Sequence, residues 1–257
     1  MKIHFYKYQA TGNDFVVIDN REAGLSLTRQ QIETLCDRKF GVGADGLMLI
    51  EKHPSLHFNL EYYNSDGSQS LCGNGSRAAV QFAARLGMVN GKASFHAYDG
   101  EHVAELLPSG IIRLKMSPVG ETRKIGDDYF LNTGSPHIIR FVDDVDAYPV
   151  FEEGRKIRYS EAFKPGGTNV NFVERLPNQA LKVRTYERGV ENETLSCGTG
   201  VTAAALAASF MGYPSPVSIQ TRGGNLLVEF KSSHSGTFEE IFLIGPAKMV
   251  FEGSLEL

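Results

Sequence analysis

Apolar and polar residues alternate over short stretches near the start of the chain, as they do in β-strands with one buried face. The predicted strands are Ile3–Tyr8, Phe15–Asp19, Leu47–Ile50 and Phe58–Tyr63. Turns rich in Gly and Asn or Asp, such as Tyr98-Asp99-Gly100, are typical of hairpins. The pattern therefore indicates mainly antiparallel strands rather than a series of strand–helix–strand units.

Three stretches are predicted to be helical, and the two that follow Cys72 and Cys197 are rich in small residues. The predicted helices are Arg29–Arg38, Gly75–Leu86 and Gly200–Phe210. Thr28 and Gln31 have the spacing of a capping box, which begins the first helix. Gly87 and Gly212 follow the other two helices and are predicted to end them. Alanine-rich sides allow such helices to lie deep against a surrounding sheet.

The chain repeats itself. The segment that starts at Cys72 is Cys-Gly-Asn-Gly-Ser-Arg-Ala-Ala, and the segment that starts at Cys197 is Cys-Gly-Thr-Gly-Val-Thr-Ala-Ala. In the same order and at nearly the same spacing, residues 11–17 parallel 133–139 and residues 99–105 parallel 223–229. This predicts two similar domains with a boundary near Ser117 and Pro118. The N-terminal half would span 1–117, with 249–257 as a candidate to return to it, and the C-terminal half 118–248.

The composition fits a folded protein of this size. Of the 257 residues, 42% are hydrophobic and 22% charged, which suffices for one large domain or two smaller ones. The net charge of −4 argues against a surface for nucleic acid or an anionic membrane. The N-terminus lacks the pattern of a signal peptide, and the longest apolar stretch is far shorter than the ~20 residues that span a bilayer. A cytoplasmic protein without nucleic-acid or membrane partners is expected.

The cysteines limit the chemistry further. The chain has three, Cys36, Cys72 and Cys197. An odd number argues against a disulfide framework, and no CxxC pair is present. His53 and His57 have HxxxH spacing, but Pro54 interrupts a helix there and the glutamate of HExxH is missing, so no metal site is predicted. Cys36 lies in the apolar pattern of the first helix and is expected to be a small buried hydrophobe.

Cys72 and Cys197 each begin a predicted helix, in the pattern Cys-Gly-x-Gly. The unpaired N–H groups of a helix start carry partial positive charge, which lowers the pKa of a thiol and can hold a carboxylate. If the two domains face each other, a small acid in the cleft has one sulfur on each side of its α-carbon. One thiolate then removes the α-proton and the opposite thiol returns one to the other face. This inverts the stereocentre without a cofactor.

Several motifs together make the chain resemble a known family. They are Thr11-Gly12-Asn13-Asp14-Phe15, Asn64-Ser65-Asp66-Gly67, Cys72-Gly73-Asn74-Gly75-Ser76-Arg77, Ser135-Pro136-His137, Thr168-Asn169-Val170-Asn171-Phe172, Tyr186-Glu187-Arg188-Gly189 and Cys197-Gly198-Thr199-Gly200. In this order they resemble diaminopimelate epimerase from the first predicted strand to the last. The resemblance implies interconversion of LL- and meso-diaminopimelate for lysine and peptidoglycan synthesis, no cofactor, and a homodimer. It also implies a mixed α/β (α+β-like) fold of two pseudo-symmetric domains. Each would be mainly antiparallel strands wrapped around a helix, with the active-site cleft between the domains.

The resemblance also implies a role for each matching residue. Cys72 would be the proton donor and Cys197 the proton acceptor in the LL-to-meso direction. His137 and Glu187 would tune the pKa values of the thiols. Glu187 and Arg188 would bind the ammonium and carboxylate groups, and a guanidinium suits a carboxylate because it can donate two parallel hydrogen bonds. The remaining substrate-binding residues would be Asn13, Asn64, Gly73, Asn74, Asn169, Gly198 and Thr199.

Two positions associated with substrate contact depart from the family pattern. Ser135 stands where many members carry Asn before Pro-His, and Gly46 stands where some carry Gln. The substrate is therefore less strongly indicated than the chemistry. The Ser135 hydroxyl can still donate a hydrogen bond, directly or through water.

Other interpretations fit less of the sequence. The segment Gly41–Gly46 matches GxGxxG, but a helix precedes it and a strand follows, which reverses the order of a dinucleotide site. A related racemase of an amino acid without a distal carboxylate would not need Arg188. A thiol–disulfide protein would hold its cysteines in CxxC. A non-catalytic amino-acid binder would not need matched thiols.

Overall fold

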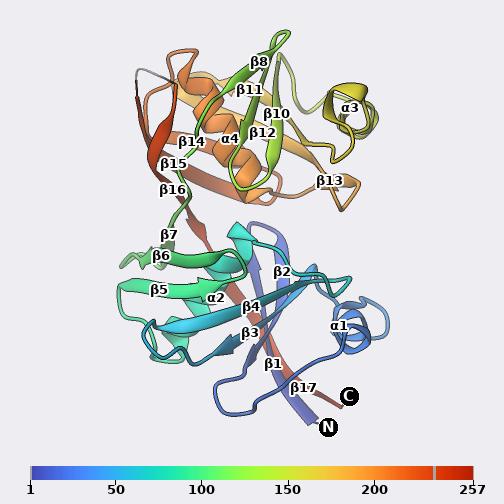
Figure 1. Cartoon of the computed structure of the whole chain (residues 1–257), viewed down its shortest axis with the longest axis vertical. Helices are drawn as coiled ribbons and strands as arrows, with labels where there is room; N and C mark the ends of the chain where they lie inside the picture. The colour runs from blue at the N-terminus through green and yellow to red at the C-terminus, as the bar shows by residue number, and fades with distance from the viewer. Residues whose placement is uncertain (1, 234–235, 257) are drawn as a thin grey trace. The chain divides into compact units, whose positions relative to one another are not determined.

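A computed structural model of the chain describes residues 2–233 and 236–256. The chain divides into two compact units: unit 1 is Met1–Leu114 with Gly245–Leu257, and unit 2 is Lys115–Ile244. In each unit, mostly antiparallel strands surround one buried helix (Figure 1). The predicted class, two repeated mixed α/β domains each wrapped around a helix, is confirmed. Of the segment predicted to return to the first half, Leu257 lies outside the described residues.

Unit 1 is built around helix α2. Its elements are β1 (Lys2–Ala10), β2 (Asn13–Asp19), α1 (Arg29–Cys36), β3 (Gly46–Glu51), β4 (Phe58–Asn64), α2 (Gly73–Arg85), β5 (Lys92–Ala97), β6 (Gly100–Leu106), β7 (Ile111–Lys115) and β17 (Lys248–Glu256). The ladder runs β17-β1-β2-β3-β4-β5-β6-β7, with β2–β3 and β4–β5 parallel and the other pairs antiparallel. Helix α2 packs against β1, β2, β3, β4, β6 and β17. The strands therefore wrap around α2.

Small side chains explain why α2 lies so deep. Ala78, Ala79 and Ala83 are wholly buried, so strand backbones can approach the helix closely. Phe82 supplies the bulk on one side and packs edge-on against Tyr8. Gly87 follows the helix with φ +73°, a conformation that favours glycine and ends the helix.

Unit 2 repeats the plan around helix α4. Its elements are β8 (Arg123–Ile125), β9 (Asp128–Asn132), β10 (Pro136–Val142), α3 (Val150–Arg158), β11 (Asn169–Leu176), β12 (Ala180–Glu187), β13 (Asn192–Thr194), α4 (Gly198–Ser209), β14 (Val217–Thr221), β15 (Gly224–Ser232) and β16 (Phe238–Pro246). The β10–β11 and β12–β14 pairs are parallel, and the other strand pairs within the unit are antiparallel. Helix α4 packs against β9, β10, β11, β12, β14 and β15.

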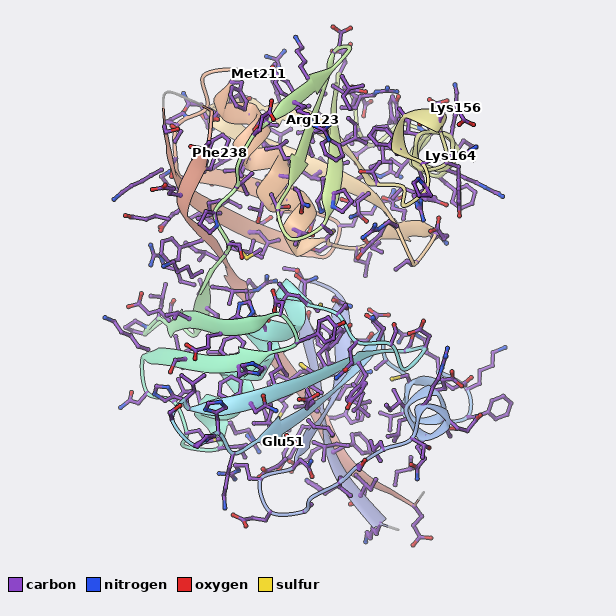
Figure 2. All side chains as sticks on the ribbon, viewed as in Figure 1. Glu51, Arg123, Lys156, Lys164, Met211 and Phe238 are labelled. Atoms are coloured by element: carbon purple, nitrogen blue, oxygen red, sulfur yellow. The ribbon has the colours of Figure 1, made fainter. Side chains whose placement is uncertain are left out.

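Figure 2 shows the side chains on this framework of strands around a helix. Lys156 of α3 and Lys164 after it extend to the outside of unit 2, where both side chains are exposed. Phe238 at the start of β16 is buried and packs edge-on against Phe210 and Phe230. Among the described residues, no helix has the length and apolar character needed to cross a membrane.

The predicted elements are confirmed, with shifted ends. Strands β1 to β4 match the predicted strands to within two residues, and the Thr28 capping box is present. Helix α1 ends at Cys36 rather than Arg38, because Asp37 takes an extended backbone and its carboxylate accepts the next N–H groups. Helices α2 and α4 begin two residues earlier than predicted, because the cysteine itself is the N-cap.

Candidate functional site

Cys72 lies at the N-terminus of α2, where its extended backbone makes it the N-cap. The Gly75 N–H donates to Cys72 Sγ at 3.3 Å, so the helix start holds the sulfur directly. Cys72 Sγ lies 3.5 Å from Asn13 Oδ1, to which its S–H donates. The sulfur is thus placed between a backbone donor and an amide acceptor.

The orientation of the Asn13 amide is fixed from both ends. Its Nδ2 donates to Asp45 Oδ2 at 2.7 Å, and its Oδ1 accepts from Asn74 Nδ2 at 3.3 Å. A carboxylate only accepts, so the amide nitrogen must face Asp45 and the oxygen must face Cys72. Asp45 is held in turn by Arg38, at 2.7 Å.

A buried positive charge lies near the same sulfur. Arg77 of α2 is wholly buried, and its Nη2 donates to Asn74 Oδ1 at 3.0 Å and Thr11 Oγ1 at 3.3 Å. Its Nε and Nη1 have no hydrogen-bond partner, and no carboxylate of the described residues pairs with it. Burial lowers the pKa of Arg77 to about 10, and the interaction with Cys72 opposes this shift. An anion at Cys72 would offset the cost of the buried charge.

Two other unit 1 positions that the resemblance associates with substrate contact are Asn64 and Gly46. Asn64 ends β4, and its Nδ2 donates to Ser68 Oγ at 3.0 Å and Ser70 Oγ at 3.2 Å in the turn that leads to the cysteine. At Gly46, a Cβ would lie 2.7 Å from the ring and hydroxyl of Tyr62 and 2.7 Å from the Tyr63 carbonyl oxygen. The departure at Gly46 therefore has a structural reason, since Tyr62 and the backbone of Tyr63 occupy the space that a side chain there would need.

In unit 2, Cys197 is the N-cap of α4 and is 6% exposed. Its Sγ lies 3.5 Å from Thr199 Oγ1. The same hydroxyl oxygen is 2.9 Å from His137 Nε2 and 3.2 Å from Ser135 Oγ, and Ser135 Oγ is 3.0 Å from His137 Nε2. Two hydroxyl groups and an imidazole thus form one cluster beside the sulfur.

His137 of β10 is wholly buried. Burial, helped by the positive charge of Arg188, lowers the pKa of His137 to about 3, so the imidazole is neutral at neutral pH. Its Nδ1 lies 3.0 Å from Asn171 Nδ2 of β11. His137 therefore acts on its surroundings as a hydrogen-bonding ring and not as a cation.

The end of β12 brings charged groups to the same cluster. The Asn169 Oδ1 accepts the Arg188 backbone N–H at 2.8 Å, and Asn169 Nδ2 donates to Ser135 Oγ at 3.2 Å. The Arg188 guanidinium is exposed and bonds the Gly166 carbonyl at 3.4 Å, which leaves donors for a carboxylate. The Glu187 carboxylate accepts from Thr194 Oγ1 at 2.8 Å.

Cys36 has different surroundings. It is the last residue of α1 and is 4% exposed in the core of unit 1. Burial raises the pKa of its thiol to about 11, so it stays protonated and unreactive. Among the described residues, no cluster of three or more His, Cys, Asp or Glu side chains is arranged to hold a metal ion.

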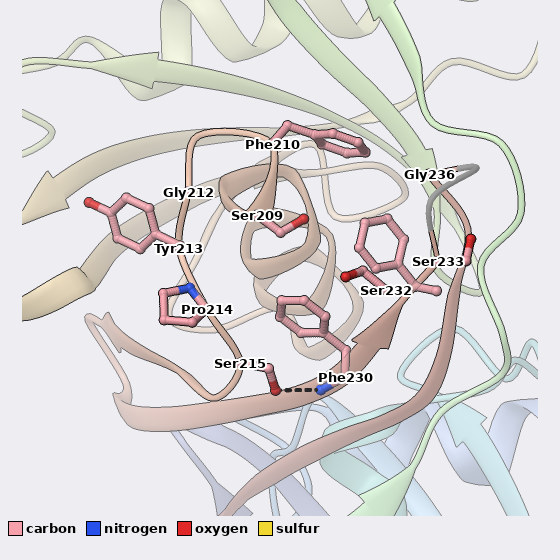
Figure 3. Close-up of a pocket in the computed structure, with 11 residues that line it drawn as sticks. Ser209, Phe210, Gly212, Tyr213, Pro214, Ser215, Phe230, Ser232, Ser233 and Gly236 are labelled. Atoms are coloured by element: carbon pink, nitrogen blue, oxygen red, sulfur yellow. Dashed lines mark hydrogen bonds between the residues drawn. The ribbon is translucent and has the colours of Figure 1, made fainter.

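A separate pocket lies at the far end of α4 (Figure 3). Its lining residues are Ser209, Phe210, Gly212, Tyr213, Pro214, Ser215, Phe230, Ser232, Ser233, Gly236 and Phe238. The Ser215 hydroxyl accepts the Phe230 N–H there at 2.9 Å. Cys197 precedes this 12-residue helix, so the pocket is about 18 Å from it along the axis. The pocket does not belong to the cysteine site.

The structure groups the sequence-predicted residues into two half-sites, one in each unit. Asn13, Asn64, Gly73 and Asn74 accompany Cys72, and His137, Asn169, Glu187, Arg188, Gly198 and Thr199 accompany Cys197. Sequence reasoning missed Asp45, Arg77 and Asn171. Asn171 could have been predicted from the sequence, because it follows Asn169 by two positions in a strand and its side chain therefore lies on the same face.

The family model and the relatives that match this chain carry the same description. The family model described as diaminopimelate epimerase matches residues 5–120 and 129–250. A diaminopimelate epimerase of Flavobacterium psychrophilum is 48% identical over 97% of this chain and 99% of that protein. One of Aquifex aeolicus is 41% identical over 98% of each.

Solved structures show the same fold at low sequence identity. A PhzF-family phenazine biosynthesis protein of Bacillus anthracis has a TM-score of 0.79 at 13% identity, with all of both chains covered. A hydroxyproline epimerase of Agrobacterium vitis, with bound trans-4-hydroxy-L-proline, has a TM-score of 0.70 at 14% identity, over 99% of this chain and 92% of that one. At these identities the likeness concerns the fold alone.

Proposed function

Because the chain belongs to the diaminopimelate epimerase family, we propose that it interconverts LL- and meso-diaminopimelate by moving one α-proton between two thiols. One observation carries the proposal: a cysteine is the N-cap of the buried helix in each of two repeated units. Each unit then supplies half of a catalytic pair, Cys72 from unit 1 and Cys197 from unit 2.

The proton count of the reaction is simple. In the LL-to-meso direction, the Cys197 thiolate takes the α-proton, and the Cys72 thiol gives its own proton to the opposite face of the same carbon. Cys197 ends as a thiol and Cys72 as a thiolate, so no electrons are transferred and no redox partner is needed. The acceptor that Asn13 presents to the Cys72 S–H and the hydroxyl that Thr199 places beside Cys197 support this direction.

The substrate has charged groups that match the side chains near each thiol. Backbone N–H groups at Gly73-Asn74 and Gly198-Thr199, at the starts of α2 and α4, suit the α-carboxylate and the negative charge that develops when the α-proton leaves. The exposed guanidinium of Arg188 suits the distal carboxylate, and Glu187 suits an ammonium group. The amides of Asn13, Asn64 and Asn169 complete the binding residues.

We further place the protein in the cytoplasm, as a homodimer that supplies lysine and peptidoglycan precursors. A pair of working thiols must stay reduced, which favours a reducing compartment. Sedimentation equilibrium should give twice the chain mass of 28.2 kDa; a single chain mass at working concentrations would contradict the dimer.

Isotope incorporation tests the reaction directly. The protein is incubated with LL-diaminopimelate in heavy water without added cofactor, and we expect deuterium on one α-carbon of the meso product. Cys72→Ala and Cys197→Ala should each abolish inversion. Cys36→Ala is the matched control and should retain it, because the Cys36 thiol is buried in the core of unit 1 and stays protonated. Turnover in either of the first two variants, or no deuterium in the product, contradicts the proposal.

A further inference from the structure

The duplication pairs residues of unlike chemistry beside the two sulfurs. The equivalent pairs are Asn13 with Ser135, Phe15 with His137, and Asn74 with Thr199. Beside Cys72 the polar side chains are therefore amides, and an amide oxygen faces the sulfur. Beside Cys197 they are hydroxyls and an imidazole. An amide oxygen only accepts a hydrogen bond, whereas a hydroxyl can donate one.

The amide of Asn171 fixes which nitrogen of His137 carries the proton. Asn171 is wholly buried, its Oδ1 accepts from Thr185 Oγ1 at 2.9 Å, and its Nδ2 donates to the Ile138 carbonyl at 3.1 Å. A carbonyl only accepts, so the nitrogen of the amide must be on that side. The same nitrogen lies 3.0 Å from His137 Nδ1. Nδ1 is therefore an acceptor, and the single proton of the neutral ring is on Nε2.

A protonated Nε2 decides where the neighbouring hydroxyl protons go. Nε2 donates to Thr199 Oγ1 at 2.9 Å or Ser135 Oγ at 3.0 Å, so neither hydroxyl can give its proton to the ring. Ser135 Oγ also accepts from Asn169 Nδ2 at 3.2 Å. Asn169 Nδ2 and His137 Nε2 are both donors, so the Ser135 hydroxyl gives its own proton to Thr199 Oγ1, at 3.2 Å. The Thr199 proton is then directed to Cys197 Sγ, at 3.5 Å.

We propose that the Thr199 hydroxyl donates a hydrogen bond to Cys197 Sγ and favours the thiolate form of Cys197 in the resting enzyme. The inference rests on the proposed function, in which Cys197 is the base of the LL-to-meso reaction. His137 and Asn171 are positioning residues that act through Thr199. The charged group that acts on His137 is Arg188, and its positive charge helps to keep the ring neutral.

Titration of the Cys197 thiol tests the hydroxyl directly. In a Cys72→Ala background, the rate of iodoacetamide alkylation of Cys197 is followed against pH by peptide mass spectrometry, which separates Cys197 from Cys36. Thr199→Val should raise the pKa of Cys197 by about one unit, so alkylation below both pKa values falls about tenfold. Thr199→Ser should restore the parent titration. Both variants keep the backbone N–H of residue 199, so they differ from the parent only in the side chain. An unchanged Cys197 titration in Thr199→Val would overturn the inference.

A second measurement tests the tautomer in the unsubstituted protein. Nitrogen-15 shifts of the histidine rings distinguish a neutral ring protonated at Nε2 from one protonated at Nδ1. The His137 signal is the one missing from His137→Gln. We expect the Nε2–H form at neutral pH, and an Nδ1–H form or a charged ring would overturn the relay from Asn171 to Thr199.

The two levels of the proposal can fail separately. The alkylation titration needs no substrate, so it reports on Thr199 even if the isotope experiment shows no epimerisation. Conversely, the protein can show full epimerase activity while Thr199→Val leaves the Cys197 titration unchanged. That result would support the proposed function and contradict this inference. In the active enzyme, Thr199→Val should also move the acidic limb of kcat/KM to higher pH, because the base must be deprotonated to act.

Discussion

The two helix starts carry glycines at equivalent positions, Gly75 and Gly200, in unequal surroundings. A Cβ on Gly200 would lie 2.4 Å from Asn171 Oδ1 and 3.3 Å from His137 Cε1. A Cβ on Gly75 would meet only ordinary contacts, at 3.4 Å or more. We therefore expect Gly200→Ala to be destabilising and Gly75→Ala to be tolerated by the fold.

The size of the effect follows from what has to move. For an ordinary contact of 3.4 Å, Asn171 Oδ1 would have to retreat by about 1 Å, which breaks its 2.9 Å hydrogen bond from Thr185. Overpacking a core costs about 1–3 kcal/mol and a lost hydrogen bond about 1 kcal/mol. Gly200→Ala should thus lower the free energy of unfolding by about 2–4 kcal/mol. Gly75→Ala should leave it unchanged or raise it slightly, since alanine favours helix.

Urea unfolding followed by far-ultraviolet circular dichroism measures both values, with the parent protein alongside. The nitrogen-15 signals of His137 provide a local readout, and they should shift in Gly200→Ala but not in Gly75→Ala. If Gly200→Ala is as stable as the parent, or if both variants lose equal stability, the clash with Asn171 is not what excludes a side chain at residue 200.

Two further predictions concern unit 1. Burial alone would raise the pKa of Asp14, but the hydrogen bonds and charges of Arg38 and Lys7 outweigh it and hold that pKa well below its usual range. The stability this carboxylate contributes is full above about pH 4, the pKa of an unfolded Asp, and is lost as the pH falls. Asp14→Asn should therefore cost about 2 kcal/mol at pH 7 and progressively less below pH 4, and an acid titration showing a constant difference would refute this. Gly46→Ala should destabilise through the clash with the Tyr62 ring and the Tyr63 carbonyl. Tyr62→Ala removes the ring but not the carbonyl, so in a double-mutant cycle of thermal unfolding the two losses should be less than additive; strict additivity would exclude the ring as an obstacle.

Local sequence determined most of the framework. The alternation of β1 and β4, the capping box at Thr28 and the glycines after α2 and α4 each depend on neighbouring residues, so the sequence alone predicted them. Element ends were less predictable because they depend on single hydrogen bonds, such as those that the Asp37 carboxylate accepts beyond α1.

The half-sites were only partly predictable for a different reason. The resemblance identified the residues grouped around each cysteine, but it did not indicate what orients them. Asp45 orients Asn13 although 32 positions separate the two residues, and this contact exists only once β2 and β3 lie side by side. The burial of Arg77 likewise depends on the strands around α2 and not on its sequence neighbours.

The unequal partners of the two sulfurs suit a reversible reaction. Each thiol acts as the acid in one direction and as the base in the other, so each half-site has to accommodate both protonation states. Unit 1 offers an acceptor for the S–H form of Cys72, in Asn13, and a buried positive charge for its thiolate, in Arg77. Unit 2 has no such charge at the equivalent position, where Thr202 instead bonds the Gly198 carbonyl. The Cys197 thiolate lacks that charge, so the N-terminus of α4 and hydrogen bonds have to stabilise it, and the Thr199 hydroxyl beside the neutral His137 is placed to supply one.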